Sequence, residues 1–241
     1  MIEKTRGIVL HNFSFGETSV IARIFTREAG LQSFLVPGVR KAKARIKQNI
    51  FQPLTLVDMV IYRKPNGGLQ HIREINCPRP WQGIPCEITK TSIAIFLAEM
   101  LAGVLKESDP GPAMFDFIVE ALELLDQTVG PIADFHLVFL VQLSGHLGFS
   151  PGNNFDKRHC YFSLKEGMYQ ATFFDHELCL DQELSRQFNA LSKCSLSNFE
   201  NLSLNPGQRK ALLHKIIDYY RFHLEGLKEI KSHHVLESVL H

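Results

Sequence analysis

The sequence contains few cysteines and no long apolar run. Its five cysteines are scattered over 241 residues, and no two of them form a C-x-x-C pair. This pattern predicts a protein of the reducing cytoplasm rather than a disulfide-stapled secreted domain. No apolar stretch approaches the roughly 20 residues that a membrane-spanning helix needs, and the first residues show no signal-peptide pattern. We therefore expect a cytoplasmic protein without a membrane partner.

Motifs of the common enzyme classes are also missing. The sequence has no Walker phosphate loop, no G-x-S-x-G and no H-E-x-x-H, and its eleven histidines follow no consistent pattern with carboxylates. Four acidic residues could indicate a metal-dependent nuclease: Asp175, Glu177, Asp181 and Glu183. Alternate acids across a turn and a helix start are more typical of a solvated face that interacts with the helix dipole. The sequence predicts no catalytic activity, no cofactor and no small-molecule substrate.

The net charge of +1 conceals an uneven distribution of charge along the chain. Residues 1–80 carry 13 Lys and Arg against 5 Asp and Glu, whereas residues 81–241 carry 13 against 20. The first segment therefore has a large positive excess and the second a negative one. Such asymmetry indicates that the first segment meets a polyanion, although chance segregation of charge is the alternative.

The first eighty residues favour β-structure. Runs rich in β-branched and aromatic residues, separated by turn signals such as Pro65-Asn66-Gly67-Gly68, predict five strands at 8–15, 20–25, 31–36, 51–62 and 69–77. In the first strand, Val9, Phe13 and Phe15 are expected to share a face. Five strands without a sustained helical period predict a small closed barrel, such as an OB-fold, and an SH3-like barrel fits the same pattern.

The hydrophobic period changes after a linker rich in proline at residues 77–86. Helical stripes follow near residues 93–104, 115–125 and 213–227, and residues 134–147 are apolar on nearly every side. Asn205-Pro206-Gly207-Gln208 is a typical helix start. We therefore predict an α+β protein of two domains: an OB-type barrel at 1–80 and a helical domain at 81–241, with an irregular hairpin insertion at 148–180.

A basic segment after Pro37-Gly38 is the sharpest local feature. Arg40 to Lys47 holds five basic residues in eight, and its position predicts an exposed connection that neutralises phosphates. Four phenylalanines could stack on bases or fill the barrel core: Phe13, Phe25, Phe34 and Phe51. The predicted DNA-binding residues are Arg6, Arg23, Arg27, Arg40, Lys41, Lys43, Arg45 and Lys47.

Four stretches of the sequence resemble the RecO family. The F-S-F-G-E-T-S-V run, the F-T-R-E-A-G hairpin, the V-P-G-V-R-K loop and L-G-F-S-P follow in the family's order, at residues 13–20, 25–30, 36–41 and 147–151. The resemblance implies an OB-fold that binds single- and double-stranded DNA, and a helical domain. It also implies strand annealing, help in loading RecA, and partnership with RecR and single-strand-binding protein.

The sequence departs from the family in one respect. Many members carry two C-x-x-C pairs that bind zinc just after L-G-F-x-P, whereas this region offers Cys160 and Cys179 with His159 and His176. His159 and Cys160 are adjacent and cannot readily chelate one ion from an ordered strand. We therefore predict that the protein binds no metal, and that five aromatic residues pack this segment in its place: Tyr161, Phe162, Tyr169, Phe173 and Phe174.

A different class of function fits the same features. The barrel could belong to a non-enzymatic adaptor whose basic loop docks onto an acidic protein surface. DNA binding measured over a series of salt concentrations separates this adaptor from a DNA-binding mediator.

Overall fold

The computed structural model describes residues 2–41, 43–63, 68–106 and 111–240. The predicted turn at 65–68 lies almost wholly outside these residues. The chain divides into two compact units, Met1–Gln127 and Thr128–His241, and each unit is described by itself.

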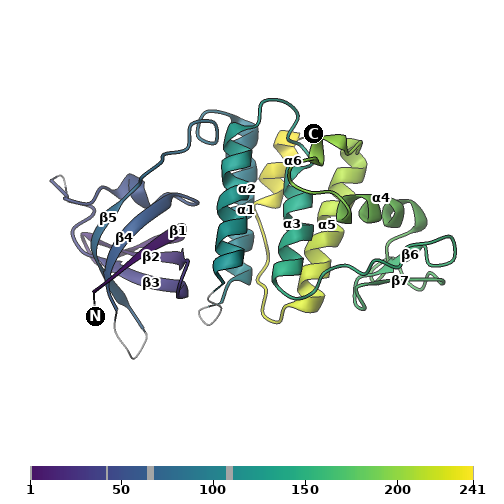
Figure 1. The fold of residues 1–241 in the computed structure, drawn as a ribbon, viewed down its shortest axis with the longest axis horizontal. Coiled ribbons are helices and arrows are strands. Elements are labelled where there is room, and N and C mark those ends of the chain that lie inside the picture. Colours follow the sequence, from purple (N-terminus) through teal and green to yellow (C-terminus); the bar gives the residue numbers. More distant parts are fainter. Residues whose placement is uncertain (1, 42, 64–67, 107–110, 241) are drawn as a thin grey trace. The chain divides into compact units, whose positions relative to one another are not determined.

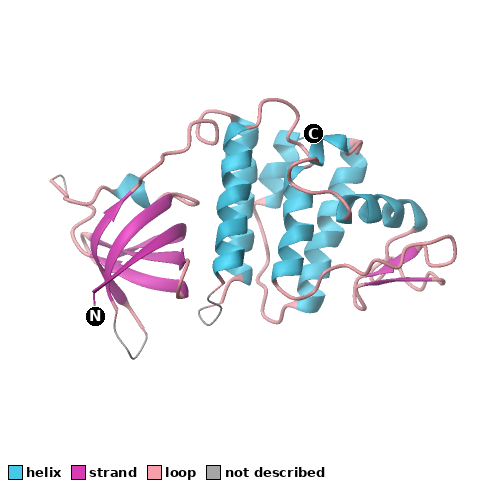
Figure 2. Cartoon of the chain, in the orientation of Figure 1, coloured by secondary structure: helices cyan, strands magenta, loops and turns pink. Residues whose placement is uncertain are grey.

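Five strands of the first unit form a closed barrel (Figures 1 and 2). They are β1 Ile2–Phe15, β2 Ser19–Thr26, β3 Gly30–Val36, β4 Leu56–Tyr62 and β5 Gln70–Asn76. The strand order is β1-β2-β3-β5-β4, and β3 and β5 are the parallel pair. A five-stranded barrel with such a crossover is the OB-type architecture that the sequence predicts.

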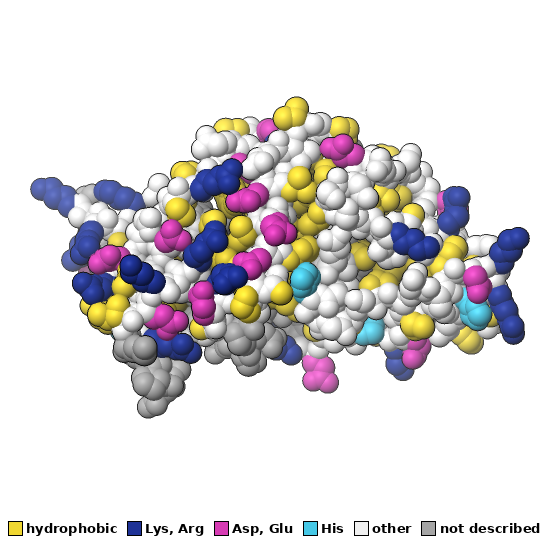
Figure 3. Space-filling view, in the orientation of Figure 1, with side chains coloured by type: hydrophobic (Ala, Val, Ile, Leu, Met, Phe, Trp, Pro, Cys, Tyr) yellow, Lys and Arg dark blue, Asp and Glu magenta, His cyan; other side chains and the backbone are white. Residues whose placement is uncertain are grey.

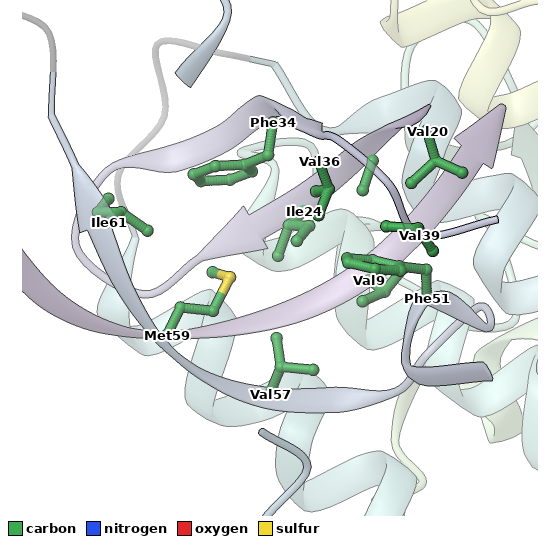
Figure 4. Close-up of a cluster of buried hydrophobic side chains, with 11 residues drawn as sticks. Val9, Val20, Ile24, Phe34, Val36, Val39, Phe51, Val57, Met59 and Ile61 are labelled. Carbon is green, nitrogen blue, oxygen red and sulfur yellow. The ribbon is translucent and has the colours of Figure 1, made fainter. Parts of the chain in front are cut away.

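The barrel core is a cluster of aliphatic and aromatic side chains (Figure 4). Alternate residues of each strand point inward, as the pleat requires. Phe34 and Phe51 are fully buried in this cluster, and Phe25 is fully buried against Phe115 of the following helices, with ring centroids 6.0 Å apart. Three of the four phenylalanines considered for base stacking therefore fill the core.

A β-bulge changes the orientation of the end of β1. The pairing of β1 with β2 shifts register between Val9 and His11. Because a bulge inserts one extra residue, the side chains beyond it face the opposite side. Val9 lies in the core, whereas Phe13 and Phe15 are 44% and 50% exposed. The prediction that Val9, Phe13 and Phe15 share a face is wrong for this reason.

Two helices complete the first unit: α1 Ile88–Val104 and α2 Pro112–Gln127. The predicted apolar stripe of α1 is buried. The Asp126 carboxylate at the end of α2 accepts hydrogen bonds from the amides of Gly83 and Ile84 at 2.7 and 2.8 Å, which ties the linker to α2. A Cβ atom at Gly83 would lie 2.2 Å from the Asp126 carbonyl oxygen, so this approach requires glycine. The domain boundary between residues 80 and 81 stays a prediction.

The second unit consists of helices and one small hairpin. Its elements are α3 Phe135–His146, β6 Tyr161–Ser163, β7 Met168–Gln170, α4 Gln182–Ser192, α5 Pro206–His223 and α6 His233–Leu240. Helix α3 is buried along most of its length, as its apolar sequence predicts, and it packs against α4 and α5. A buried ion pair at 2.7 Å joins Asp134, before α3, to Arg209 of α5.

The start of α5 is held by a capping box. Asn205 Oδ1 accepts a hydrogen bond from the Gln208 amide at 2.9 Å, and Gln208 Oε1 accepts one from the Asn205 amide at 3.0 Å. The predicted helix start is confirmed. These two bonds satisfy amides that the helix itself leaves unpaired.

The capping box gives a stability prediction. We expect Asn205→Ala to lower the free energy of unfolding by about 1 kcal/mol, because it removes the side-chain acceptor of the cap. Asn205→Asp, which keeps an acceptor at this position, is the matched control. Urea denaturation followed by circular dichroism measures both. Equal stability of the alanine variant and the parent would contradict a structural role for the cap.

Candidate nucleic-acid interface

The basic loop, residues 40–47 of the connection between β3 and β4, is held at its start by the barrel. Val39 is buried in the barrel core, and Ile46 packs against the edge of the same cluster. The Arg40 amide donates a hydrogen bond to the Thr18 carbonyl at 3.0 Å. The apolar residues on either side therefore anchor the loop, while its five cationic side chains are exposed.

The connection is held again where it enters β4. Asn12 Nδ2 donates to the Phe51 carbonyl at 2.7 Å, and the Leu54 amide donates to the Val9 carbonyl at 2.6 Å. Leu54 has a φ of 62° and is followed by Thr55, whose carbonyl accepts from the Val9 amide at 3.0 Å. The predicted strand at 51–62 therefore begins only at Leu56. A proline at position 53 and a left-handed residue after it break the strand.

Ion pairs divide the cations of the barrel into two groups. Five arginines lie within 4.0 Å of a carboxylate: Arg6, Arg27, Arg63, Arg73 and Arg79. Within the described part of the chain, no carboxylate forms an ion pair with Arg23 or with any cation of the basic loop. Figure 3 shows dark blue side chains gathered over the barrel on the face drawn. No ion pair among the described residues neutralises these cations, so they are available to an external anion.

Arg27 and Arg6 already have partners in α2 and β4. Arg27 Nε and Nη2 donate to the two carboxylate oxygens of Asp116 at 2.9 and 2.7 Å. This bidentate bond holds the pKa of Asp116 below its usual value. Arg6 lies 5.9 Å from the ring centroid of Phe115 and 3.9 Å from Asp58. Of the eight predicted DNA-binding residues, these two differ from the cations of the basic loop because each already has a carboxylate partner.

A groove runs beside the basic loop. It has a volume of about 720 Å³ and lies among the basic loop, the linker and α1. Arg45 and Lys47 are its cationic lining residues, and apolar side chains such as Ile95 line most of the rest, beside a few uncharged polar ones. Trp81 also lines it and donates from Nε1 to the Leu54 carbonyl at 2.9 Å. The sequence did not indicate this groove, because its lining residues come from segments up to fifty residues apart.

Exposed aromatic side chains lie on the outer face of the barrel. Phe13 of β1 packs near His11, with ring centroids 6.2 Å apart. His11 pairs with Arg23 of β2 in the sheet register, so an aromatic and an unpaired cation share this face. Aromatic rings beside cations are the usual elements of a single-strand-binding surface.

The hairpin segment of the second unit is packed by aromatic residues. Phe162 contacts Tyr169, and Tyr161 contacts Phe173, with centroid distances of 4.9 and 5.5 Å. The predicted packing is confirmed for these four residues and is wrong for Phe174, which is 70% exposed. Aromatic side chains thus form the core of this hairpin.

The four zinc-ligand candidates of this segment do not gather into one site. Cys160 and Cys179 are buried. His159 Nδ1 lies 3.1 Å from the Asp156 carboxylate, and the ring of His176 packs against Phe173. Among the described residues, the one group of three potential metal ligands lies elsewhere.

The acidic cluster considered for a nuclease has local structural roles. Asp181 caps α4 by accepting from the Leu184 amide at 2.8 Å, and Glu183 in the first turn pairs with Arg186 at 2.8 Å. Asp175 accepts from the Glu177 amide at 2.9 Å. These contacts are those of a helix start and a turn.

Comparisons with known proteins agree with this architecture. Residues 1–81 match the family model "Recombination protein O N terminal", and residues 86–233 match "Recombination protein O C terminal". The chain is 32% identical to the DNA repair protein RecO of Phocaeicola vulgatus and 33% identical to that of Bacteroides fragilis, covering 99% of each chain in both comparisons. The described helices include none that is both long and apolar enough to cross a membrane. The chain belongs to the RecO family of DNA repair and recombination proteins.

Proposed function

We propose that the chain is a recombination mediator that binds single- and double-stranded DNA through its barrel. The observation that carries this proposal is the set of exposed cations of the basic loop, which have no carboxylate partner among the described residues. Cations of this kind bind phosphates without sequence preference and release counterions from the DNA. Arg23, on the same outer face as Phe13, extends this surface. Family membership supports the role in DNA repair and recombination.

Strand annealing follows from the same charge distribution. A surface that neutralises phosphates of two strands at once lowers their mutual repulsion and lets complementary bases meet. In this proposal Arg40, Lys41, Lys43, Arg45 and Lys47 bind phosphates directly. Arg6 and Arg27 contribute less, because a phosphate must first replace their existing partners Asp58 and Asp116.

The proposal includes protein partners and a cellular setting. The helical part is proposed to contact RecR and single-strand-binding protein, and the complex helps load RecA onto coated strands in the cytoplasm. The protein acts by binding rather than by catalysis. These parts of the proposal rest on the resemblance of the whole chain to the family.

A second candidate function is favoured by the groove beside the basic loop. A groove with apolar walls and two cationic residues, Arg45 and Lys47, fits a peptide that combines acidic and apolar side chains. In that case the basic loop docks a protein rather than DNA. Fluorescence anisotropy with labelled single-stranded DNA and with a labelled acidic peptide separates the two functions.

Neutralising the basic loop tests the main proposal. We expect the fourfold variant Arg40→Ala, Lys41→Ala, Lys43→Ala, Arg45→Ala to lose at least about tenfold in affinity for single-stranded DNA at moderate salt. The slope of log affinity against log salt should fall by about one unit for each phosphate contact removed. Circular dichroism should show an intact fold, because these side chains are exposed.

The matched control removes the same charge from the second unit. Its four substituted residues are exposed cations: Lys157, Arg158, Lys165 and Lys228. With alanine at all four positions, DNA affinity and salt slope should stay close to those of the parent. Equal loss in both fourfold variants would mean that net charge rather than the loop governs binding. Undiminished DNA binding by the loop variant, with loss of a protein partner, would establish the adaptor.

Base stacking is tested at Phe13. We expect Phe13→Ala to weaken single-strand binding by about 1–3 kcal/mol, the usual contribution of one stacked base. Affinity for duplex DNA should change less, because paired bases cannot reach the ring. Phe174→Ala removes an exposed ring from the second unit, 70% exposed against 44% for Phe13, and serves as the control. Equal affinities of both variants for single strands would exclude stacking at Phe13.

A further inference from the structure

Two helices of the second unit bring three potential metal ligands together. His214 lies on α5, and His233 and Glu237 lie one helical turn apart on α6. One ligand atom of each residue lies within 4.8 Å of the other two. Side chains at positions i and i+4 of a helix point to the same side, so α6 presents both of its ligands to α5.

His233 is buried and incompletely bonded. Its residue surface is only 8% exposed, and its Nδ1 atom makes no hydrogen bond within the described part of the chain. The ring interacts with the Ile230 backbone, while Nδ1 is left without a hydrogen bond of good geometry among the described residues. Buried polar side-chain atoms nearly always have a partner, so an unsatisfied imidazole nitrogen points to a ligand.

The carboxylate of Glu237 is already oriented. His214 Nε2 lies 2.5 Å from Oε1, and Lys210 Nζ donates to Oε2 at 3.1 Å. The side chain of Glu237 is 10% exposed, so both contacts form in a largely dry setting. Lys210 thus engages one carboxylate oxygen and leaves the other directed at the histidines. An outer hydrogen bond of this kind fixes the geometry of a metal-ligating carboxylate.

We propose that His214, His233 and Glu237 bind one divalent transition-metal ion of the zinc class. Two imidazole nitrogens and one carboxylate oxygen suit zinc, nickel or cobalt, whereas magnesium and calcium prefer oxygen ligands alone. Three protein ligands leave a fourth position of a tetrahedral ion open to water. The ion replaces the hydrogen bond between His214 and Glu237 and satisfies a nitrogen of His233.

This site differs from the zinc site of the family in place and in ligands. It contains no cysteine, and it lies on α5 and α6 rather than in the segment after L-G-F-S-P. The sequence-based prediction of no metal rested on the missing cysteine pairs, so it did not consider residues of two separate helices. The expected consequence of binding is that the ion links α6 to α5.

The full chain, stripped of metal with a chelator, provides the test. Zinc chloride should bind with one ion per chain in calorimetry. At about a hundredfold excess over the dissociation constant, it should raise the thermal midpoint by a few degrees. Cobalt chloride should give the visible absorption bands of a tetrahedral or five-coordinate ion, and excess zinc should remove them. Absence of saturable binding of either ion would overturn the proposal.

Variants locate the ion. His233→Ala and Glu237→Gln should each lower zinc affinity at least tenfold and abolish the cobalt bands, whereas His234→Ala, which changes the exposed neighbour of His233, should preserve both. If His233→Ala fails to fold, Glu237→Gln and His214→Ala test the site, because the side chain of His214 is half-exposed and its loss should leave the fold intact. Retention of the ion in those variants, or its loss in a Cys160→Ser, Cys179→Ser variant, would place it elsewhere and overturn the proposal.

Discussion

Two backbone hydrogen bonds at Val9 fix the segment that follows the basic loop to strand β1 of the barrel. The Val9 amide and carbonyl bond to Thr55 and Leu54, so the chain returning from the basic loop is fixed to β1 next to the bulge. The bulge turns Phe13 outward, and Leu54 offers its carbonyl to Trp81 of the linker. The left-handed conformation of Leu54 costs roughly 1 kcal/mol. The tertiary contacts of this segment offset that cost.

Charge pairing explains why the basic loop stands out from the rest of the barrel. Most arginines on other parts of the barrel are close to a carboxylate, and such exposed pairs contribute little to stability. Five like charges in eight residues repel one another, and no ion pair of these side chains among the described residues offsets that repulsion. A local arrangement that disfavours the folded state is expected at functional sites. This arrangement supports the proposal that the basic loop binds an anionic partner.

The features that the sequence predicted are local ones. Strand alternation, the apolar stripe of α1 and the Asn205 capping box each depend on residues within a few positions of one another. The resemblance of short motifs identified the family, which the match over nearly the full chain confirms.

The features that the sequence did not predict depend on contacts between distant segments. The bulge after Val9 turns the side chains of Phe13 and Phe15 to the outer face of the barrel. The pairing of Arg27 with Asp116 joins residues 89 positions apart. The groove and the cluster of His214, His233 and Glu237 likewise form only when separate elements meet. Strand alternation and helical period carry no information about contacts between segments that are distant in sequence. The basic residues could therefore be found from the sequence, but their carboxylate partners could not.

In the proposed function, DNA contacts the basic loop of the barrel. Acetylation of lysines followed by mass spectrometry, with and without saturating single-stranded DNA, measures this contact on the unaltered protein. We predict that DNA protects Lys41, Lys43 and Lys47 strongly, while Lys157, Lys165 and Lys228 of the second unit react equally in both samples. Unchanged reactivity of the loop lysines, with protection in the second unit, would show that DNA binds elsewhere than at the basic loop.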